Sequence, residues 1–391
     1  MTSNQLDSRT IIIIIVAGIA LILGGLLIAQ ATPLIFPVQA SAESQQIDNL
    51  FRIALVIGGA IFLLVQGLLV YSIVRFRARA GDTSEGINLH GNATLEIVWT
   101  AIPAVIVLVL TVLSYQVWVS IQSVKNDEMA VKVTGARFAW SFAYEVPDPR
   151  DTSQKLTINS KELHTYVGRP MKLEMVTQDV IHSFWVPAFR VKQDVMPGRT
   201  TTVRFTPIQT EETYPVRYPI KCAELCGSGH GAMVSWIVVH EDEADYNAWF
   251  SEQLDLVLNP PEDPVARGRQ VLASGAYPCA GCHVLADLGW AGLTGPSLNG
   301  VGDRAATVRA NATGLSPEEY LDRSIYYPNE YIVPGFGAGL MPQFQPNDPA
   351  GANYMSPDDH FAIIAYLCTQ TSTGESACDL ERLRSLVFGN S

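Results

Sequence analysis

Three long runs without a charged side chain occupy the first third of the 391-residue sequence. They cover residues 10–42, 53–74 and 97–124. Each run is long enough to cross a bilayer as a helix, which takes about 20 apolar residues. The sequence therefore predicts a protein anchored in a lipid bilayer rather than a purely soluble one. The remaining two thirds read as water-exposed domains, which argues against a polytopic transporter.

Residues 1–40 fit two interpretations, a cleaved signal peptide or an extra membrane helix. The apolar stretch 11–29 is followed by small-residue motifs at 29–31 and 38–40, which resemble cleavage sites. The polar segment before the stretch carries a weaker positive charge than signal peptides usually have. Both interpretations stay open on the sequence.

Residues 41–125 are predicted to form a transmembrane helical hairpin. Three arginines follow the second apolar run, whereas residues 31–51 contain neither Lys nor Arg. Because Lys and Arg collect on the cytoplasmic side of membrane helices, the loop 75–96 is placed in the cytoplasm. The second helix of the hairpin returns the chain across the bilayer, so the rest of the chain is predicted to be extracytoplasmic.

Residues 126–243 are predicted to form an all-β domain. Segments 131–134, 171–176, 201–205 and 234–239 alternate apolar and polar side chains. Pro and Gly turns separate these short segments, and helical periodicity does not interrupt them. The pattern favours a sandwich or a barrel.

A helix and a linker are predicted over residues 244–264, followed by an all-α domain over residues 265–391. Apolar side chains recur along one side of residues 245–258, and three prolines then favour an extended, stiff linker. Farther on, Ser316 and Ser356 each precede a Pro and two acidic residues, a pattern typical of helix starts.

The formal net charge is −12. A protein that binds nucleic acid should carry a basic face, so no nucleic-acid partner is expected. An acidic surface suits a basic protein partner, or it simply keeps the domains soluble. The acidic run at residues 241–245 is interpreted as a solvated patch.

Two thiols, an imidazole and a thioether lie close together within residues 222–233. Soft sulfur combined with imidazole favours copper or zinc over hard cations. The thioether points to copper, because zinc takes four tight ligands and has little use for Met. His182 is the candidate for a second imidazole from a distant strand, whereas His164 and His240 are interpreted as surface or ladder residues. A disulfide between the two thiols is disfavoured in surroundings so rich in metal-binding groups.

Cys279, Cys282 and His283 form the attachment pattern of a c-type haem. The two thiols of this pattern add to the haem, and the adjacent His becomes an axial ligand. A zinc site or a redox site is the alternative, but a zinc site would want a second matching Cys pair, which Cys368 and Cys378 do not provide. That last pair is instead predicted to form a disulfide, since disulfides persist outside the cytoplasm. Two free thiols remain the alternative.

A second axial haem ligand is expected before the last helix of the C-terminal domain. Met341 is favoured for this role, and Met355, beside a helix start, is interpreted as a packing residue. His360 is a third candidate, but on the helix that follows it is interpreted as partly exposed.

Residues 50–240 resemble subunit II of a haem-copper cytochrome c oxidase. The residues that carry this resemblance are His90-Gly91-Asn92, residues 95–103, the aromatic run 138–144, the His182 segment, Pro197-Gly198-Arg199 and residues 222–233. Residues 265–371 resemble a class I cytochrome c, with Gly295 to Leu298 similar to the haem-edge loop and Met341-Pro342 similar to the ligand motif. The resemblance implies a multidomain chain, with a helical hairpin, a cupredoxin-like domain and a fused cytochrome c domain.

The resemblance to subunit II implies a dinuclear copper centre. Two thiolates would bridge two copper ions, each ion would take one imidazole, and a thioether and a backbone carbonyl would complete the shells. The residues that match these positions are Cys222, Cys226, His182, His230, Met233 and Glu224. The side chain of Glu224 also matches a link to a magnesium ion at the interface with the catalytic subunit.

Three further residues match functional positions of this family. Glu96 matches a position that admits protons to the catalytic subunit, although an acid at a helix N-terminus is also favoured by the dipole. Phe138 stands where the family usually has a Trp at which electrons from soluble cytochrome c enter, and Trp140 keeps the second aromatic. Cross-strand packing is the alternative for this aromatic run. The change to Phe puts the usual docking route in doubt.

The expected function is that of the electron-entry subunit of a terminal cytochrome c oxidase in a bacterial plasma membrane. Electrons would pass from an external donor through haem c and dinuclear copper to catalytic subunit I, which reduces oxygen to water. The expected donor is a cytochrome c or a blue copper protein. Other oxidase subunits are further expected partners. The alternatives are the copper-containing small subunit of a nitric oxide reductase, a copper-delivery protein and a free-standing membrane-anchored electron carrier. A quinol oxidase subunit is disfavoured, because such relatives lack the copper ligands.

Overall fold

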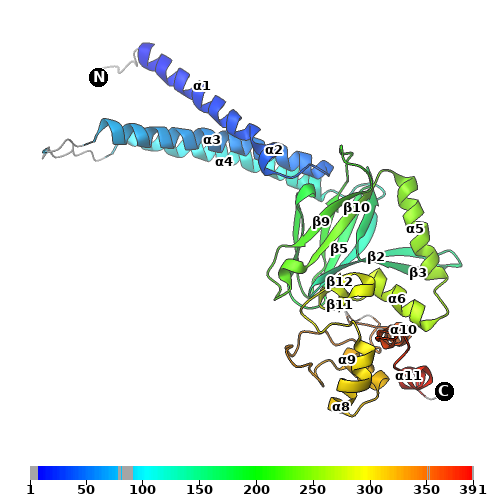
Figure 1. Cartoon of the computed structure of the whole chain (residues 1–391). Helices are drawn as coiled ribbons and strands as arrows, with labels where there is room; N and C mark the ends of the chain where they lie inside the picture. Colours follow the sequence, from blue (N-terminus) through cyan, green and yellow to red (C-terminus); the bar gives the residue numbers. More distant parts are fainter. Residues whose placement is uncertain (1–7, 78–80, 82–90, 350, 352, 390–391) are drawn as a thin grey trace. The chain divides into compact units, whose positions relative to one another are not determined.

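The computed structural model describes residues 8–77, 81, 91–349, 351 and 353–389. The chain divides into two compact units, Met1–Ser123 and Val124–Ser391 (Figure 1). His90 and most of the predicted cytoplasmic loop lie outside the described residues.

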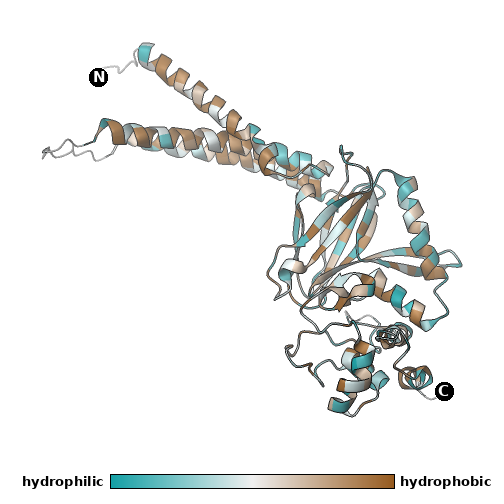
Figure 2. Cartoon of the chain, viewed as in Figure 1, coloured by the Kyte–Doolittle hydropathy of each residue, from teal (hydrophilic) through white to brown (hydrophobic). Residues whose placement is uncertain are grey.

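The first unit consists of long apolar helices. They are α1 (Ser8–Gln30), the short α2 (Thr32–Ile35), α3 (Ala42–Arg75) and α4 (Ala93–Gln122). Among the described residues, three helices are long and apolar enough to cross a membrane, and Figure 2 shows the apolar colouring along them. The helical hairpin predicted from the uncharged runs is therefore formed by α3 and α4. Ser41 starts α3 with a reciprocal capping contact to Ser44.

Helix α1 packs closely on α3 through glycines. A Cβ at Gly25 would overlap the carbonyl of Val56, and a Cβ at Gly59 would lie 3.2 Å from Cα of Gly25. Small residues allow two helix backbones to approach closely, which is a common way to pack helices in membranes.

The second unit begins with two five-stranded sheets, as the alternating segments predict. One sheet has the order β3-β2-β1-β5-β8 and the other β4-β10-β9-β6-β7, with parallel pairing of β1 with β5 and of β4 with β10. The strands are β1 (Met129–Ala136), β2 (Ala139–Asp148), β3 (Asp151–Ser160), β4 (Leu163–Tyr166), β5 (Met171–Thr177), β6 (His182–Val186), β7 (Val191–Val195), β8 (Thr201–Phe205), β9 (Val216–Cys222) and β10 (Val234–His240). Fully buried side chains such as Phe142, Leu173, Phe184, Ile220 and Ile237 form its core.

The rest of the second unit is mostly helical, as predicted. Its elements are α5 (Glu243–Leu258), α6 (Pro264–Ser274), β11 (Val284–Leu285), β12 (Trp290–Ala291), α7 (Val301–Arg304), α8 (Ala310–Thr313), α9 (Pro317–Tyr326), α10 (Pro357–Cys368) and α11 (Leu380–Phe388). Both predicted helix starts are confirmed, because Ser316 caps α9 and Ser356 caps α10. The predicted disulfide between Cys368 and Cys378 is present and ties the segment before α11 to the end of α10.

The predicted linker after α5 is formed by residues 259–263, and it ends one residue earlier than expected. Pro264 is the first residue of α6, and Asp263 caps that helix. The side-chain nitrogen of Gln270 donates a hydrogen bond of 2.9 Å to the carbonyl of Leu256, so α6 folds back on the end of α5. Pro is favoured at the first position of a helix, where its missing N–H costs nothing, so Pro264 opens α6 instead of extending the linker.

Helices α6 and α10 cross at a glycine. A Cβ at Gly268 would overlap the carbonyl oxygen of Ala362, so only glycine lets the two helices approach this closely. The crossing closes the core of the C-terminal region, in which Leu272, Ile364 and Leu367 are buried.

Candidate metal centre

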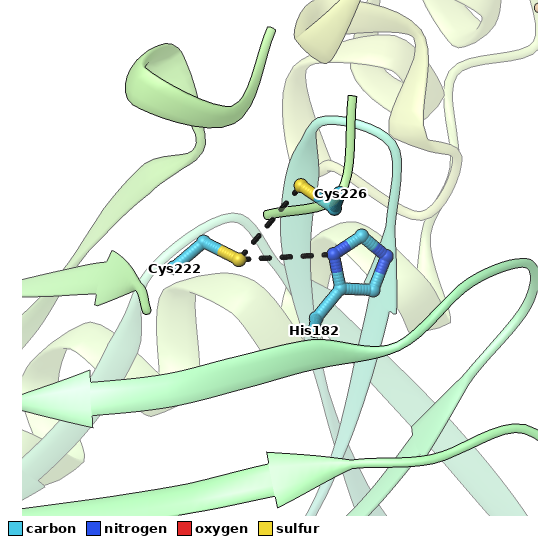
Figure 3. A group of neighbouring side chains, drawn as sticks. All are labelled: His182, Cys222 and Cys226. Atoms are coloured by element: carbon cyan, nitrogen blue, oxygen red, sulfur yellow. Dashed lines mark hydrogen bonds between the residues drawn. The ribbon is translucent and has the colours of Figure 1, made fainter. Parts of the chain in front are cut away.

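Two thiols and an imidazole converge at one end of the sandwich. Cys222 ends β9, His182 begins β6, and Cys226 lies in the loop that follows β9. The Sγ atom of Cys222 lies 3.8 Å from Sγ of Cys226 and 3.8 Å from Nδ1 of His182. Figure 3 shows the three side chains facing one another. Both cysteines are free thiols, so the disfavoured disulfide is not formed.

The other three predicted donors complete this cluster. Nδ1 of His230 lies 3.6 Å from Sγ of Cys226, and Sδ of Met233 lies 3.9 Å from the same sulfur. The carbonyl oxygen of Glu224 lies 3.2 Å from Sγ of Cys222. A backbone hydrogen bond of 3.2 Å from the amide of Cys222 to the carbonyl of Met233 closes the 222–233 loop. The structure thus brings together all six residues that the sequence singled out.

The donor set and its spacing fit a soft metal ion. Ligand atoms held at about 2.0–2.3 Å by one tetrahedral ion lie roughly 3.3–3.8 Å apart, close to the separations found here. His182 and Met233 are fully buried, and both thiols are buried as well. Buried sulfur and imidazole donors favour copper over cations that prefer oxygen.

The two thiols of the cluster differ in acidity. Burial raises the pKa of Cys222, but the imidazole of His182 and nearby backbone groups outweigh this effect and lower it to about 6. Burial raises the pKa of Cys226 to about 12, together with the charge of the neighbouring Cys222. In the metal-free chain one thiolate therefore forms well before the other.

Asp179 fixes the orientation of His182, a role that the sequence analysis missed. Its Oδ1 lies 2.8 Å from Nε2 of His182, and its Oδ2 accepts a hydrogen bond of 2.8 Å from the backbone N–H of Arg137. Burial opposes ionisation of Asp179, but the hydrogen bonds from His182 and from backbone amides lower its pKa to about 2. An acid three residues before a predicted ligand was the available signal. The contact leaves Nδ1 of the imidazole facing the sulfur atoms.

The two aromatic residues of the predicted electron-entry route are both buried. Phe138 and Trp140 are each 3% exposed. The Trp140 ring makes edge contacts with His182 and Phe184, at centroid distances of 6.0 and 5.4 Å. Both rings therefore pack inside the folded chain, and Trp140 packs across the two sheets rather than across one pair of strands. Their role in electron entry stays a prediction. Phe138 in particular is covered and cannot present a docking surface to a soluble protein.

Glu96 lies in the first turn of α4. Its Oε1 accepts a hydrogen bond of 3.3 Å from the backbone N–H of Asn92, which is the N-cap of that helix. This contact agrees with the interpretation of Glu96 as a helix N-terminal acid.

A cavity in the C-terminal region is lined by the attachment pattern. Cys279, Cys282 and His283 all line it, and both cysteines are free thiols. Nδ1 of His283 lies 2.7 Å from the carbonyl oxygen of Pro296, which leaves Nε2 free to bind a metal. A Cβ at Gly295 would lie 2.8 Å from the imidazole. Burial lowers the pKa of His283, which favours the neutral, ligating form.

The structure leaves two of the three candidates for the second axial haem ligand in place. Met341 and Met355 both line the cavity, and Met355 is 1% exposed within the core. The prediction that His360 is partly exposed is wrong, because its side chain is fully buried. Nε2 of His360 lies 2.8 Å from Asp322, and its ring stacks on Tyr326 at 3.8 Å. This histidine holds α10 against α9.

His164 and His240 lie in the paired strands β4 and β10, so the interpretation as ladder residues is confirmed and that as surface residues is wrong. Nδ1 of His164 lies 3.1 Å from Nε2 of His240. The His164 ring stacks on Trp249 of α5 at 3.8 Å. Burial is the main cause that lowers the pKa of His164 to about 3, and the charge of the neighbouring His240 lowers it further. Helix α5 covers this pair, which a strand pattern alone does not reveal.

A β sandwich that buries thiols, imidazoles and a thioether, and that follows long apolar helices in the chain, has the features of a membrane-anchored, cupredoxin-like metal domain. Residues 29–117 match the transmembrane domain of cytochrome c oxidase subunit II, and residues 129–241 match its periplasmic domain. The chain is 35% identical over 262 residues to cytochrome c oxidase subunit 2 of Synechocystis sp., covering 55% of this chain and 74% of that protein. The chain belongs to the cytochrome c oxidase subunit II family.

Two further comparisons describe the extent of the likeness. Cytochrome c oxidase subunit 2 of Thermostichus vulcanus is 34% identical over 290 residues, covering 61% of this chain and 84% of that protein. The crystal structure of the periplasmic domain of subunit II of cytochrome oxidase of Bradyrhizobium japonicum covers 34% of this chain and 99% of that chain, with 27% identity and a TM-score of 0.29. The family matches end at residue 241. The chain is thus a subunit of an oxidoreductase complex, with a helical region after the matched domains.

Proposed function

We propose that this chain is the electron-entry subunit of a terminal cytochrome c oxidase, passing electrons from an external donor via haem c to dinuclear copper and on to the catalytic subunit that reduces oxygen to water. Membership of the subunit II family supports the copper part of this proposal. The observation that carries the copper part of the proposal is the convergence of six sulfur, imidazole or carbonyl donors at one end of the sandwich.

The residues of the 222–233 loop and His182 would hold the copper ions. Bound there, a copper pair supplies a site that takes up and releases one electron at a time. The chain contributes a fixed geometry, because Asp179 orients His182 and a backbone hydrogen bond closes the loop. His182, Met233 and both thiols are buried, which limits the access of water to the site, whereas His230 is partly exposed.

The 279–283 loop would hold haem c through Cys279 and Cys282, with His283 as one axial ligand. The carbonyl of Pro296 orients the imidazole so that Nε2 is available. Met341 is the proposed second ligand, and Met355, which lines the same cavity, is the alternative. These groups line a largely apolar cavity, which suits a large apolar ring.

The membrane anchor would determine on which side of the bilayer the sandwich and the C-terminal region lie. The arginines at the end of α3 and just after it favour a cytoplasmic 75–96 loop, so the sandwich and the C-terminal region would face the outside of a bacterial plasma membrane. The proposed partners are catalytic subunit I and other oxidase subunits, together with a cytochrome c or a blue copper protein as donor. Glu224 would contribute to a magnesium ion at the subunit interface, and Glu96 would admit protons.

Metal analysis of the purified, detergent-solubilised full chain tests this function. The proposal predicts two copper ions and one covalently bound haem per chain, together with a spin-resonance signal from one electron shared by two copper nuclei. A single exchangeable copper ion without haem would contradict it and would favour a copper-delivery protein. The absence of a large membrane partner on co-purification would instead favour a free-standing electron carrier.

A further inference from the structure

The turn between β1 and β2 consists of Arg137 and Phe138 and touches both candidate sites. Hairpin turns usually expose their side chains to solvent. Phe138 is nevertheless buried, with only 3% of its surface exposed. The segments that cover it come from the 222–233 loop and the 279–283 loop, which are far apart in the sequence.

The 222–233 loop rests on the ring of Phe138. A Cβ at Gly229 would overlap this ring, and a Cβ at Gly227 would lie 3.0 Å from its Cζ atom. These two glycines lie between Cys226 and His230, two of the proposed copper ligands. Glycine is therefore required for the loop to approach the ring this closely.

The 279–283 loop rests on the backbone of the same turn. A Cβ at Gly281 would lie 2.5 Å from the backbone nitrogen of Phe138 and 2.7 Å from its carbonyl carbon. The Sγ atom of Cys282 lies 3.4 Å from the carbonyl oxygen of Arg137. Backbone and sulfur of the haem-attachment pattern are thus in direct contact with this turn.

The side chain of Arg137 makes a second connection between the two sites. Its guanidinium forms an ion pair of 3.3 Å with Asp179, whose other oxygen bonds His182. Arg137 also lines the cavity that contains Cys282 and His283. One residue therefore contacts the proposed haem cavity and, through one carboxylate, a proposed copper ligand.

We propose that the Arg137–Phe138 turn is the internal bridge over which electrons pass from the 279–283 loop to the 222–233 loop, and that its burial closes this aromatic position to soluble donors. The inference rests on the proposed function and names the residues that connect its two sites. In each transfer the haem side is oxidised by one electron and the copper side is reduced by one. No bond forms or breaks, and no proton moves. A soluble donor then delivers its electron at the cavity of the C-terminal region.

A matched pair of glycine variants tests the contact itself. Gly229→Ala places a methyl group in the ring of Phe138. A Cβ at Gly231, on the other side of His230, meets no atom of the described residues within 4 Å beyond its chain neighbours. Amide hydrogen exchange of the full chain, measured without metal, is expected to be faster at residues 137–139 and 279–283 in Gly229→Ala. Exchange in Gly231→Ala should match the unchanged chain. Equal exchange in both variants would overturn the contact.

The electron step is tested by photoreducing the haem and following the copper signal. Misplacing reacting groups by about 1 Å can cost about a hundredfold in rate, and we expect Phe138→Leu to slow the transfer by about tenfold or more. Trp236→Leu is the control, because this ring packs on Arg217 within the sandwich at 5.2 Å. Gly281→Ala, which pushes the two loops apart, should slow the transfer as well and replaces Phe138→Leu if that variant does not fold.

The outcomes separate the bridge from the proposed function. Absence of the haem band and the copper signal from the unchanged chain would refute the proposed function and the bridge with it. Both signals present, with equal transfer rates in the unchanged chain, Phe138→Leu and Gly281→Ala, would overturn the bridge alone. Reduction of copper by a soluble cytochrome ahead of the haem would also overturn it, because the covered aromatic would then be open to donors.

Discussion

Asp179 and His182 form a hydrogen-bonded pair in which Oδ1 of the carboxylate lies 2.8 Å from Nε2 of the imidazole. The other ring nitrogen faces Sγ of Cys222 at 3.8 Å. This arrangement assigns each ring nitrogen one partner, so the tautomer and the ring orientation are set before any metal binds. The strand β6 supplies the imidazole, and the segment just before it supplies the carboxylate.

Replacing Asp179 by Asn should weaken copper binding without unfolding the sandwich. Loss of a carboxylate behind a ligating His typically costs about 10–100-fold in metal affinity. Competition with a copper chelator on the full chain measures this change. Asp194→Asn is the matched control, because Asp194 bonds Ser183, the residue after the ligand, at 2.8 Å. Equal affinities of the two variants would show that Asp179 does not position His182.

The buried pair His164 and His240 should make the sandwich less stable in acid. His164 has a pKa of about 3 in the folded chain, below the ordinary 6.5. Between these values the unfolded chain binds more protons, so stability is full above pH 6.5 and falls as the pH drops toward 3. Between pH 7 and pH 5, His164 alone would lower the free energy of unfolding by up to about 2 kcal/mol.

Thermal unfolding of the detergent-solubilised chain checks this acid sensitivity. The melting temperature should fall between pH 7 and pH 5, and it should fall less in His164→Gln, which cannot be protonated. The groups that face His164 are His240, Glu162, Arg217 and, from α5, Trp249. An identical fall in the variant would assign the acid sensitivity to other groups.

Met341 and Met355 should respond differently to replacement by Leu. If Met341 ligates the haem iron, Met341→Leu removes a ligand that raises the reduction potential, so the potential should fall. Met355→Leu changes only packing and should cost less than about 1.5 kcal/mol of stability, with the potential unchanged. Potentiometric titration of both variants gives the comparison. A fall in potential confined to Met355→Leu would reverse the assignment.

Removing the disulfide between Cys368 and Cys378 should destabilise the C-terminal region alone. The closed loop is short, with a sequence separation of 10. A disulfide that closes a loop of this size stabilises the folded state by about 2–3 kcal/mol. The double variant with Ser at both positions should therefore melt earlier while its haem band and copper signal persist. An unchanged melting temperature would show that the disulfide adds nothing to the folded chain.

The parts of the site that lie close together in the sequence could be predicted well. Two thiols, an imidazole and a thioether within residues 222–233 indicate a soft metal site, because few other roles bring these groups together. The same holds for the pattern from Cys279 to His283. Capping residues such as Ser316 also act within one turn, so local sequence determines them.

The parts that depend on tertiary contacts could not be predicted. The burial of Phe138 arises from Gly229 and Gly281, which are distant in the sequence and carry no side chain to form a pattern. His164 looks like an ordinary strand residue until Trp249 of α5 covers it. Pro264 reads equally as part of a linker or as the first residue of a helix, and only the packing of α6 on α5 decides between the two.

The most direct test of the central claim is the spin-resonance and absorption spectrum of two reciprocal variants of the full chain. Cys226→Ser should lose the signal of an electron shared by two copper nuclei and keep the covalent haem band. Cys279→Ser should weaken covalent haem attachment and keep the copper signal. Persistence of the shared-electron signal in Cys226→Ser would contradict the ligand assignment and, with it, the account of the buried cluster as the copper site.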